Sequence, residues 1–296
     1  MPRIARSPLG MGSSMDKSAN VICSVRPLKG FAFIFAISLA FAFYSAPPAA
    51  RAADAEAVTI DTNFTVYTPP VRLDRPAPTA RASVVLMTGG NGRLPLEADG
   101  TINGNGNFLI RSANLFLRNG LNVMMPDTVP AHPNGLTDED RLSATHAAEL
   151  QGFINAAQNR WRKPVWVVGT SNGSISTVTA GGFRPALARL RGVVLTSTVT
   201  VLPADAQATF NLYAVRITVP TLVVWHQDDH CSLSPPAGSA ALFEVLPSID
   251  KASVSFEHGH SVAQDPCQAF SEHGYAGIEE EVVDEIAEFI RGPEQD

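Results

Sequence analysis

The chain has 296 residues, of which 45% are apolar and 17% are charged, and its formal net charge is −6. This length allows one large core and does not require a second domain. We expect residues 1–52 to be a targeting segment and residues 53–296 to form a single domain. Loss of residues 1–52 removes six basic side chains and one acidic side chain, which changes the net charge to −11. Such a surface repels nucleic acid and anionic membranes, which excludes both as expected partners.

The first 52 residues have the pattern of a secretory signal peptide with an extended basic region. Arg26 and Lys29 precede an apolar run over residues 31–43, and an A-x-A site follows at residues 50–52. The alternative is a transmembrane anchor, but the run of about 14 residues is shorter than the roughly 20 that span a bilayer. We therefore expect an exported protein, periplasmic or extracellular, with no stable membrane insertion after cleavage.

The cysteine count predicts a crosslink in the exported protein. Cleavage removes Cys23 and leaves Cys231 and Cys267. An even number of cysteines in an exported protein predicts a disulfide bond between them. Two buried free thiols are the alternative.

Strand-like and helix-like segments alternate from residue 83 onward. Short apolar runs predict buried strands, whereas longer runs with polar caps and 3.6-residue periodicity predict helices. Strands that are almost wholly apolar and alternate with helices predict a mostly parallel, doubly wound sheet with helices on both faces, an α/β fold. The predicted strands are 83–88, 121–125, 164–168, 193–198, 221–225 and 252–256, and the predicted helices are 108–119, 137–162, 174–180, 239–246 and 278–291, with an earlier antiparallel pair at 58–60 and 64–67.

The segment 169–173 reads GTSNG, which is the pattern G-x-S-x-G. An apolar strand precedes it and a small-residue stretch that can begin a helix follows it. A serine between a strand and a helix lies on a tight turn with its hydroxyl exposed at the top of the sheet. This context predicts Ser171 as a nucleophile, although the short pattern also occurs by chance.

A glycine-rich segment, GGNG at residues 89–92, follows the first predicted strand. Backbone N–H groups of such a loop can stabilise an oxyanion, and the predicted donors are Gly90, Asn91 and Asn172, which follows the serine. A phosphate-binding loop is the first alternative, but neither glycine-rich phosphate motif is completed here. A plain turn is the second.

Two adjacent carboxylates, Asp228 and Asp229, follow the predicted strand 221–225. Either can orient a histidine and stabilise its imidazolium. A metal site made of these two residues with His226 and His230 is an alternative, but the chain shows no repeated ligand spacing, and we expect no metal.

Three histidines follow the last predicted strand, namely His258, His260 and His273. Any of them can serve as a general base. Proximity to the end of the strand favours His260. The apolar neighbours Phe270 and Tyr275, which can orient a ring and exclude water, favour His273, so the residues alone leave this assignment open.

The order of serine, acid and C-terminal histidine resembles the α/β-hydrolases, over roughly residues 58–291. SVVLMTGGNGRL is similar to their oxyanion-loop strand, PVWVVGTSNG to their nucleophile turn and VPTLVVWHQDD to their acid strand, and SEHGYAGIEEEVVDEIAEFI resembles the histidine loop of the dienelactone-hydrolase-like branch. The resemblance implies the α/β-hydrolase fold, a serine-hydrolase mechanism and no cofactor. It favours Asp229 as the acid and His273 as the base, with His260 as the alternative base.

The resemblance has one departure. Dienelactone hydrolases typically use a cysteine nucleophile where Ser171 stands here, so their substrate is not transferred to this chain. About twenty residues separate the strands near 198 and 221, which predicts no large lid. We expect hydrolysis of a small-molecule ester or related acyl bond through an acyl-enzyme. The alternatives are an acyltransferase, a thioesterase, a peptidase or a non-catalytic binding protein on the same fold.

Overall fold

A computed structural model of the chain describes residues 3–5, 56–59, 70–74, 79–94, 96–97, 101–102, 106–128, 132–183 and 187–292. The cleavage site expected at residue 52 and the apolar run 31–43 lie outside these residues, as does the strand expected at 64–67. The expected division into a signal peptide and one domain therefore stays a prediction. Within the described part of the chain, none of the helices combines the length and apolar character needed to cross a bilayer.

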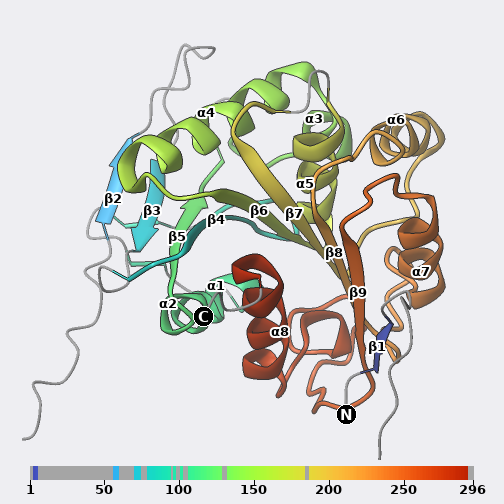
Figure 1. The fold of residues 1–296 in the computed structure, drawn as a ribbon. Helices are drawn as coiled ribbons and strands as arrows, with labels where there is room; N and C mark the ends of the chain where they lie inside the picture. Colours follow the sequence, from blue (N-terminus) through green and yellow to red (C-terminus); the bar gives the residue numbers. More distant parts are fainter. Residues whose placement is uncertain are drawn as a thin grey trace, which may run out of the picture. The chain divides into compact units, whose positions relative to one another are not determined.

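The described strands form one nine-stranded sheet in the order β1-β9-β8-β7-β6-β4-β5-β3-β2 (Figure 1). Its six central strands run parallel, and the edge strands β1, β2 and β3 pair antiparallel. The parallel strands are β4 (Ala82–Met87), β5 (Leu121–Pro126), β6 (Val165–Thr170), β7 (Leu190–Thr196), β8 (Thr221–His226) and β9 (Lys251–Phe256), and the edge strands are β1 (Arg3–Ala5), β2 (Glu56–Thr59) and β3 (Pro70–Asp74).

Helices cover both faces of the sheet, and each face has its own apolar core (Figure 1). Side chains alternate between the two cores along β4, where Val85 and Met87 face one core and Val84 and Leu86 face the other. One face is covered by α4 (Ala144–Trp161), α5 (Asn172–Gly182), α6 (Ala204–Ala214) and α7 (Pro236–Val245), and the other by α1 (Phe108–Arg111), α2 (Ala113–Arg118) and α8 (Glu279–Arg291).

Two of the predicted helices are each divided in two. The segment 137–162 contains α3 (Asp138–Arg141) and α4, because Ser143 leaves the helical conformation and caps α4 by accepting a hydrogen bond from the His146 N–H at 3.1 Å. The segment 108–119 is interrupted at Ser112, between α1 and α2. Both interruptions occur at serines, but only the Ser143 side chain caps a helix, whereas the Ser112 hydroxyl makes no capping hydrogen bond.

Three further differences concern elements that the sequence pattern did not indicate. Helix α6 was not predicted, and it is the only helix between β7 and β8 in the described residues, so no large lid lies there. Strand β3, which pairs with β2, was not predicted either, and the expected partner at residues 64–67 lies outside the described part of the chain. Strand β1 lies at the edge beside β9, with Arg3 opposite Ser255, although it belongs to the expected targeting segment.

Candidate active site

The loops that follow the parallel strands bring the predicted site residues to the carboxyl edge of the sheet. Ser171 follows β6, the segment 89–92 follows β4 and Asp229 follows β8. His273 lies in the short 3₁₀ helix η1 (Glu272–Gly274), in the connection between β9 and α8. Ligand sites of open α/β sheets lie at this edge.

Ser171 has the backbone conformation of a sharp strand-to-helix turn, with φ 52° and ψ −131°. A non-glycine residue with positive φ is strained, and such strain is common at functional sites. Both glycines of the GTSNG segment are required, because a side chain at either position would collide with a neighbouring residue. A Cβ on Gly169 would meet the Thr177 hydroxyl, and one on Gly173 would meet the Met87 carbonyl oxygen.

The Ser171 hydroxyl is accessible and unengaged. The residue is partly exposed, and its backbone N–H donates to the Thr196 carbonyl of β7 at 3.2 Å. Within the described residues its Oγ makes no hydrogen bond, including none to His273. The turn therefore holds the backbone firmly and leaves the hydroxyl free to meet a ligand.

Asp229 is the buried member of the two adjacent carboxylates, with 3% of its surface exposed, whereas Asp228 is exposed. Its Oδ1 accepts a hydrogen bond from the Cys231 N–H at 2.9 Å. Its Oδ2 accepts from the Ser234 hydroxyl at 3.1 Å and lies 2.9 Å from Nδ1 of His273. This arrangement suits Asp229 to orient a histidine.

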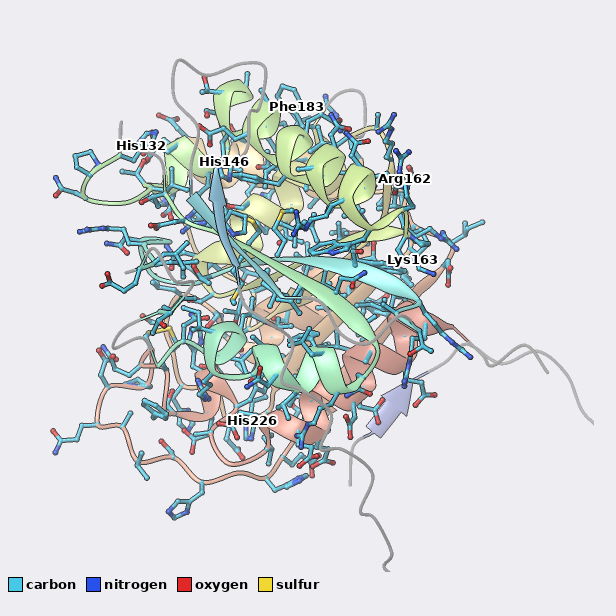
Figure 2. The ribbon with its side chains drawn as sticks, turned by 90° about the vertical axis from the view of Figure 1, so that its left-hand side faces the viewer. His132, His146, Arg162, Lys163, Phe183 and His226 are labelled. Atoms are coloured by element: carbon cyan, nitrogen blue, oxygen red, sulfur yellow. A yellow bond between two sulfur atoms is a disulfide. The ribbon has the colours of Figure 1, made fainter. Side chains whose placement is uncertain are left out.

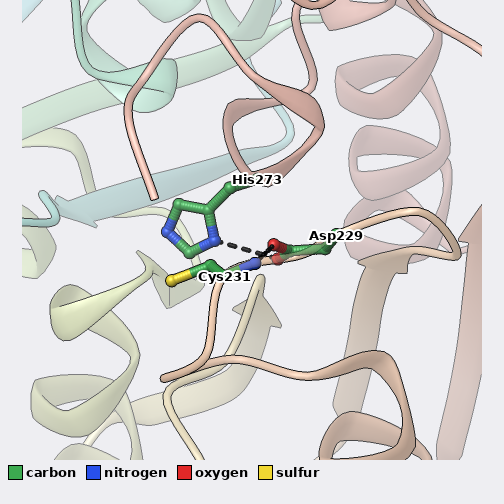
Figure 3. Close-up of side chains that lie close together, drawn as sticks. All are labelled: Asp229, Cys231 and His273. Carbon is green, nitrogen blue, oxygen red and sulfur yellow. Dashed lines mark hydrogen bonds and ion pairs between the residues drawn. The ribbon is translucent and has the colours of Figure 1, made fainter. Parts of the chain in front are cut away.

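His273 is 4% exposed, and the carboxylate of Asp229 determines which nitrogen carries its proton (Figure 3). A carboxylate only accepts hydrogen bonds, so the neutral ring carries its proton on Nδ1 and presents a lone pair on Nε2. The Ser234 hydroxyl lies 2.9 Å from the same Nδ1. Nε2 is buried and has no hydrogen-bond partner in the described part of the chain. A buried acceptor without a partner is a site where a proton can be received.

Residues from two neighbouring strands fix the backbone around His273. The Ser197 hydroxyl, after β7, donates to the His273 carbonyl at 2.7 Å. The Tyr275 hydroxyl donates to the Val224 carbonyl of β8 at 3.0 Å and accepts from the Ser197 N–H at 3.0 Å. Burial raises the pKa of Tyr275, which keeps this hydroxyl protonated. No sequence pattern indicated these roles of Ser197 and Ser234, because both depend on contacts between distant segments.

The other two histidines after β9 lie away from Asp229. His258 is exposed, and its Nε2 is 2.7 Å from Oε2 of Glu281. His260 is also exposed. Its backbone N–H donates to the Ala276 carbonyl at 2.8 Å, and its ring has no hydrogen-bond partner among the residues that the structure describes. The geometry therefore places His273, and neither of these two, beside the carboxylate.

The residues of the alternative metal site are not brought together. His226 is buried on the α8 side of the sheet, opposite the face that carries His146 (Figure 2). Its Nε2 contacts the His258 carbonyl at 3.1 Å and its Nδ1 accepts from the Asp228 N–H at 3.1 Å. Among the described residues, the one cluster with metal-ligand side chains is Asp229, Cys231 and His273, whose ligand atoms lie within 4.8 Å of one another (Figure 3). The Cys231 sulfur is bonded to another sulfur and offers no thiolate.

The predicted disulfide between Cys231 and Cys267 is present, with the two Cα atoms 4.6 Å apart. Cys231 lies two residues after Asp229, and Cys267 lies six residues before His273. The bond thus joins the loop of the carboxylate to the loop of the histidine.

The glycine loop after β4 lies against the serine turn. A Cβ on Gly89 would come within 2.9 Å of the Ser171 Cβ, so only glycine fits there. Gly90 and Asn91 are exposed, and neither N–H has a hydrogen-bond partner among the described residues. Asn172 is the first residue of α5, where backbone N–H groups lack intrahelical partners and the helix dipole favours an anion.

No protein-family model matches the chain, and no curated protein sequence does. Solved structures do match. An esterase from Pyrococcus furiosus aligns with a TM-score of 0.57 at 13% identity, over 81% of this chain and 92% of that one. A dienelactone hydrolase from Anabaena variabilis aligns with a TM-score of 0.54 at 16% identity, over 80% and 97%. A monoacylglycerol lipase from Paleococcus ferrophilus aligns with a TM-score of 0.51 at 17% identity, over 75% and 97%. The chain has the α/β-hydrolase fold, as the resemblance implied.

Proposed function

We propose that this chain is a serine hydrolase that cleaves a small-molecule ester or related acyl bond through an acyl-enzyme. The observation that carries the proposal is the His273 ring, whose Nδ1 contacts Asp229 at 2.9 Å while its buried Nε2 has no partner within the described structure. A histidine oriented in this way is prepared to accept a proton. The esterase, the lipase and the dienelactone hydrolase that share the fold support acyl chemistry by analogy.

In the proposed reaction, His273 Nε2 takes the proton from the Ser171 hydroxyl as the oxygen attacks the carbonyl carbon of the ester. The Asp229 carboxylate stabilises the imidazolium that forms. The Ser171 hydroxyl must turn toward Nε2 when the ester binds, since no hydrogen bond joins these two groups in the described structure.

The tetrahedral intermediate carries a negative charge on the former carbonyl oxygen. The N–H groups of Gly90, Asn91 and Asn172 are the proposed donors to this oxyanion. Collapse of the intermediate breaks the bond to the alcohol, which leaves with the proton from His273. Water then attacks the acyl-enzyme, with the same histidine as base, and releases the acid.

We also propose that the protein is exported, with residues 1–52 removed as a signal peptide. The Cys231–Cys267 bond supports this location, because disulfides persist in oxidising compartments. N-terminal sequencing of the protein recovered from outside the cytoplasm tests the proposal. A mature N-terminus close to Ala53 is expected, whereas an intact N-terminus would contradict it.

The hydrolase proposal is tested by labelling the protein with a fluorophosphonate, which reacts with activated serines. We expect one adduct, located by peptide mass spectrometry on Ser171. The Ser171→Ala variant should not be labelled. A labelled Ser171→Ala variant, or a folded wild-type protein that neither labels nor hydrolyses a panel of esters of varied acyl length, would contradict the proposal.

A further inference from the structure

A wholly buried arginine, Arg141, lies behind the glycine loop that follows β4. It is the last residue of α3, and its guanidinium donates through Nη2 to the Gly90 carbonyl at 3.1 Å and through Nη1 to the Ser176 hydroxyl at 2.8 Å. Burial lowers the pKa of Arg141 to about 10, so the side chain is charged at neutral pH. Burying a charge is costly unless its hydrogen bonds compensate, so the position of this group is held by specific contacts.

The contact with Gly90 determines where the neighbouring N–H points. In a planar trans peptide, the C=O of one residue and the N–H of the next point in opposite directions. The Gly90 carbonyl is directed at Arg141, so the Asn91 N–H is directed away from it. The Gly89 carbonyl accepts from the Gly92 N–H at 3.2 Å, which likewise orients the Gly90 N–H. These are the two loop donors of the proposed oxyanion hole.

Glycine at position 92 leaves the space that the Arg141 guanidinium occupies. A Cβ on Gly92 would come within 2.8 Å of Arg141 Nη2, and Gly92 has a φ of +77°, which favours glycine. The close approach of the guanidinium to the loop therefore depends on glycine at this position.

Helix α3 also contacts Asn172, whose backbone N–H is the third proposed donor. The Asp138 carboxylate accepts a hydrogen bond from the side-chain amide of Asn172 at 3.0 Å. The backbone carbonyl of Arg141 accepts from the Thr179 hydroxyl of α5 at 2.8 Å. One turn of helix thus connects the glycine loop to the beginning of α5.

We propose that Arg141 is a positioning residue of the oxyanion hole, which acts by fixing the Gly90–Asn91 peptide so that its N–H faces the reacting carbonyl. The inference rests on the proposed hydrolase function. Arg141 touches no substrate and acts through the Gly90 carbonyl. Its loss should lower the stabilisation of the transition state and leave ground-state binding of the ester almost unchanged.

The test compares Arg141→Met and Arg141→Lys with Ser176→Ala. Methionine removes both donors, while lysine keeps the charge but has one nitrogen for two partners that Arg141 reaches with separate nitrogens. Ser176→Ala removes the partner of Nη1 and leaves the bond from Nη2 to Gly90, so it is the matched control for structural damage. Rates on a chromogenic acetate ester are divided by the concentration of active sites, titrated with a fluorophosphonate, so that misfolded protein does not contribute.

Loss of one N–H donor of an oxyanion hole lowers kcat by about 10²–10³-fold. An N–H donor that points in the wrong direction should therefore lower kcat by about 10–100-fold in both arginine variants. KM should change by less than about threefold, since the contact acts on the transition state. Affinity for an alkylboronic acid, which forms a tetrahedral anion on the serine, should fall by a similar factor. Ser176→Ala should retain kcat within about threefold.

Equal losses of kcat in Ser176→Ala and in the arginine variants would overturn the inference, as would a loss confined to KM. If Arg141→Met does not fold, Arg141→Lys decides. Amide hydrogen exchange of Gly92, whose buried N–H donates to the Gly89 carbonyl at 3.2 Å, separates this inference from the proposed function, because it does not require activity. Faster exchange in Arg141→Lys than in Ser176→Ala supports the positioning role even in a protein that hydrolyses no ester, and unchanged exchange contradicts it.

Discussion

Two groupings of serine, histidine and acid in the described part of the chain differ in which atoms are left without a partner. At the carboxyl edge of the sheet are Ser171, His273 and Asp229. A second grouping joins α4 to α5. In it His146, labelled in Figure 2, contacts Glu149 of the same helix through Nδ1 at 3.0 Å and Ser176 of α5 through Nε2 at 2.9 Å. Judged by residue types and distances alone, the second grouping looks more complete than the first.

Access and hydrogen bonding distinguish the two. Ser176 has no exposed surface, and its hydroxyl is shared between His146 and Arg141. The adjoining cavity has a volume of only about 20 Å³, too small for an ester. At the edge of the sheet, by contrast, Ser171 is partly exposed, and neither its hydroxyl nor the buried Nε2 of His273 has a partner among the described residues. A satisfied network supports the fold, whereas unsatisfied groups at an accessible edge can do chemistry.

The largest effect on activity should come from replacing one of the two serines by alanine, and the two replacements should have different consequences. Ser171→Ala should lower kcat by about 10⁴–10⁶-fold without unfolding the protein, because the residual rate comes only from binding and the oxyanion hole. Ser176→Ala should instead cost about 1–3 kcal/mol of stability, because it leaves buried donors and acceptors unpaired. Steady-state kinetics and urea unfolding of both variants test the comparison. Near-full activity in folded Ser171→Ala would remove the basis for the proposed nucleophile.

The sequence predicted the parts of this comparison that depend on local patterns. Apolar runs located the parallel strands, and the GTSNG segment placed Ser171 on its turn, because both signals lie within a few consecutive residues. The break before Ser143 and helix α6 were missed because neither has a strong local signal. The contacts of Arg141 with Gly90 and of Ser234 with His273 join segments about 40 to 50 residues apart, and only the fold brings them together.

The histidines offer the second test. His273→Ala should lower kcat by a factor close to that of Ser171→Ala, since residues of one catalytic unit act together. His260→Ala is the matched control, because the ring of His260 is exposed and lies in the same connection between β9 and α8. Its kcat should stay within about threefold of the wild type, as for most exposed substitutions. The reverse result, a large loss in His260→Ala alone, would show that the base has been assigned wrongly.

The disulfide should have a smaller effect, on stability first and on activity second. Replacing Cys231 and Cys267 together by serine removes a crosslink between residues 36 positions apart, which should cost about 2–4 kcal/mol. The carboxylate loop and the histidine loop then lose their covalent connection, so kcat should fall by about tenfold or less. Chemical unfolding and kinetics below the unfolding transition measure the two effects. Intact mass with an alkylating agent and no reductant provides the check on the wild type, in which two alkylated thiols would contradict the bond.

The smallest expected effect is a dependence of stability on pH that arises in the second grouping. Burial is the main cause that lowers the pKa of His146 below its usual 6.5, against the opposing effect of Glu149. The folded protein therefore keeps this ring neutral at pH values where the unfolded chain has already bound a proton. Because the unfolded state binds more protons, the contribution of this ring to the free energy of unfolding should be complete above pH 6.5 and should decrease as the pH falls from there toward the lower pKa of the folded state.

Melting temperatures at about pH 7.5 and about pH 5 measure this decrease. His146→Gln is the control, because glutamine can hydrogen-bond to Glu149 or Ser176 but does not titrate, and all other histidines and carboxylates are common to both proteins. The wild type should lose more stability than His146→Gln over this interval, and an equal loss in the two proteins would show that the buried ring does not contribute.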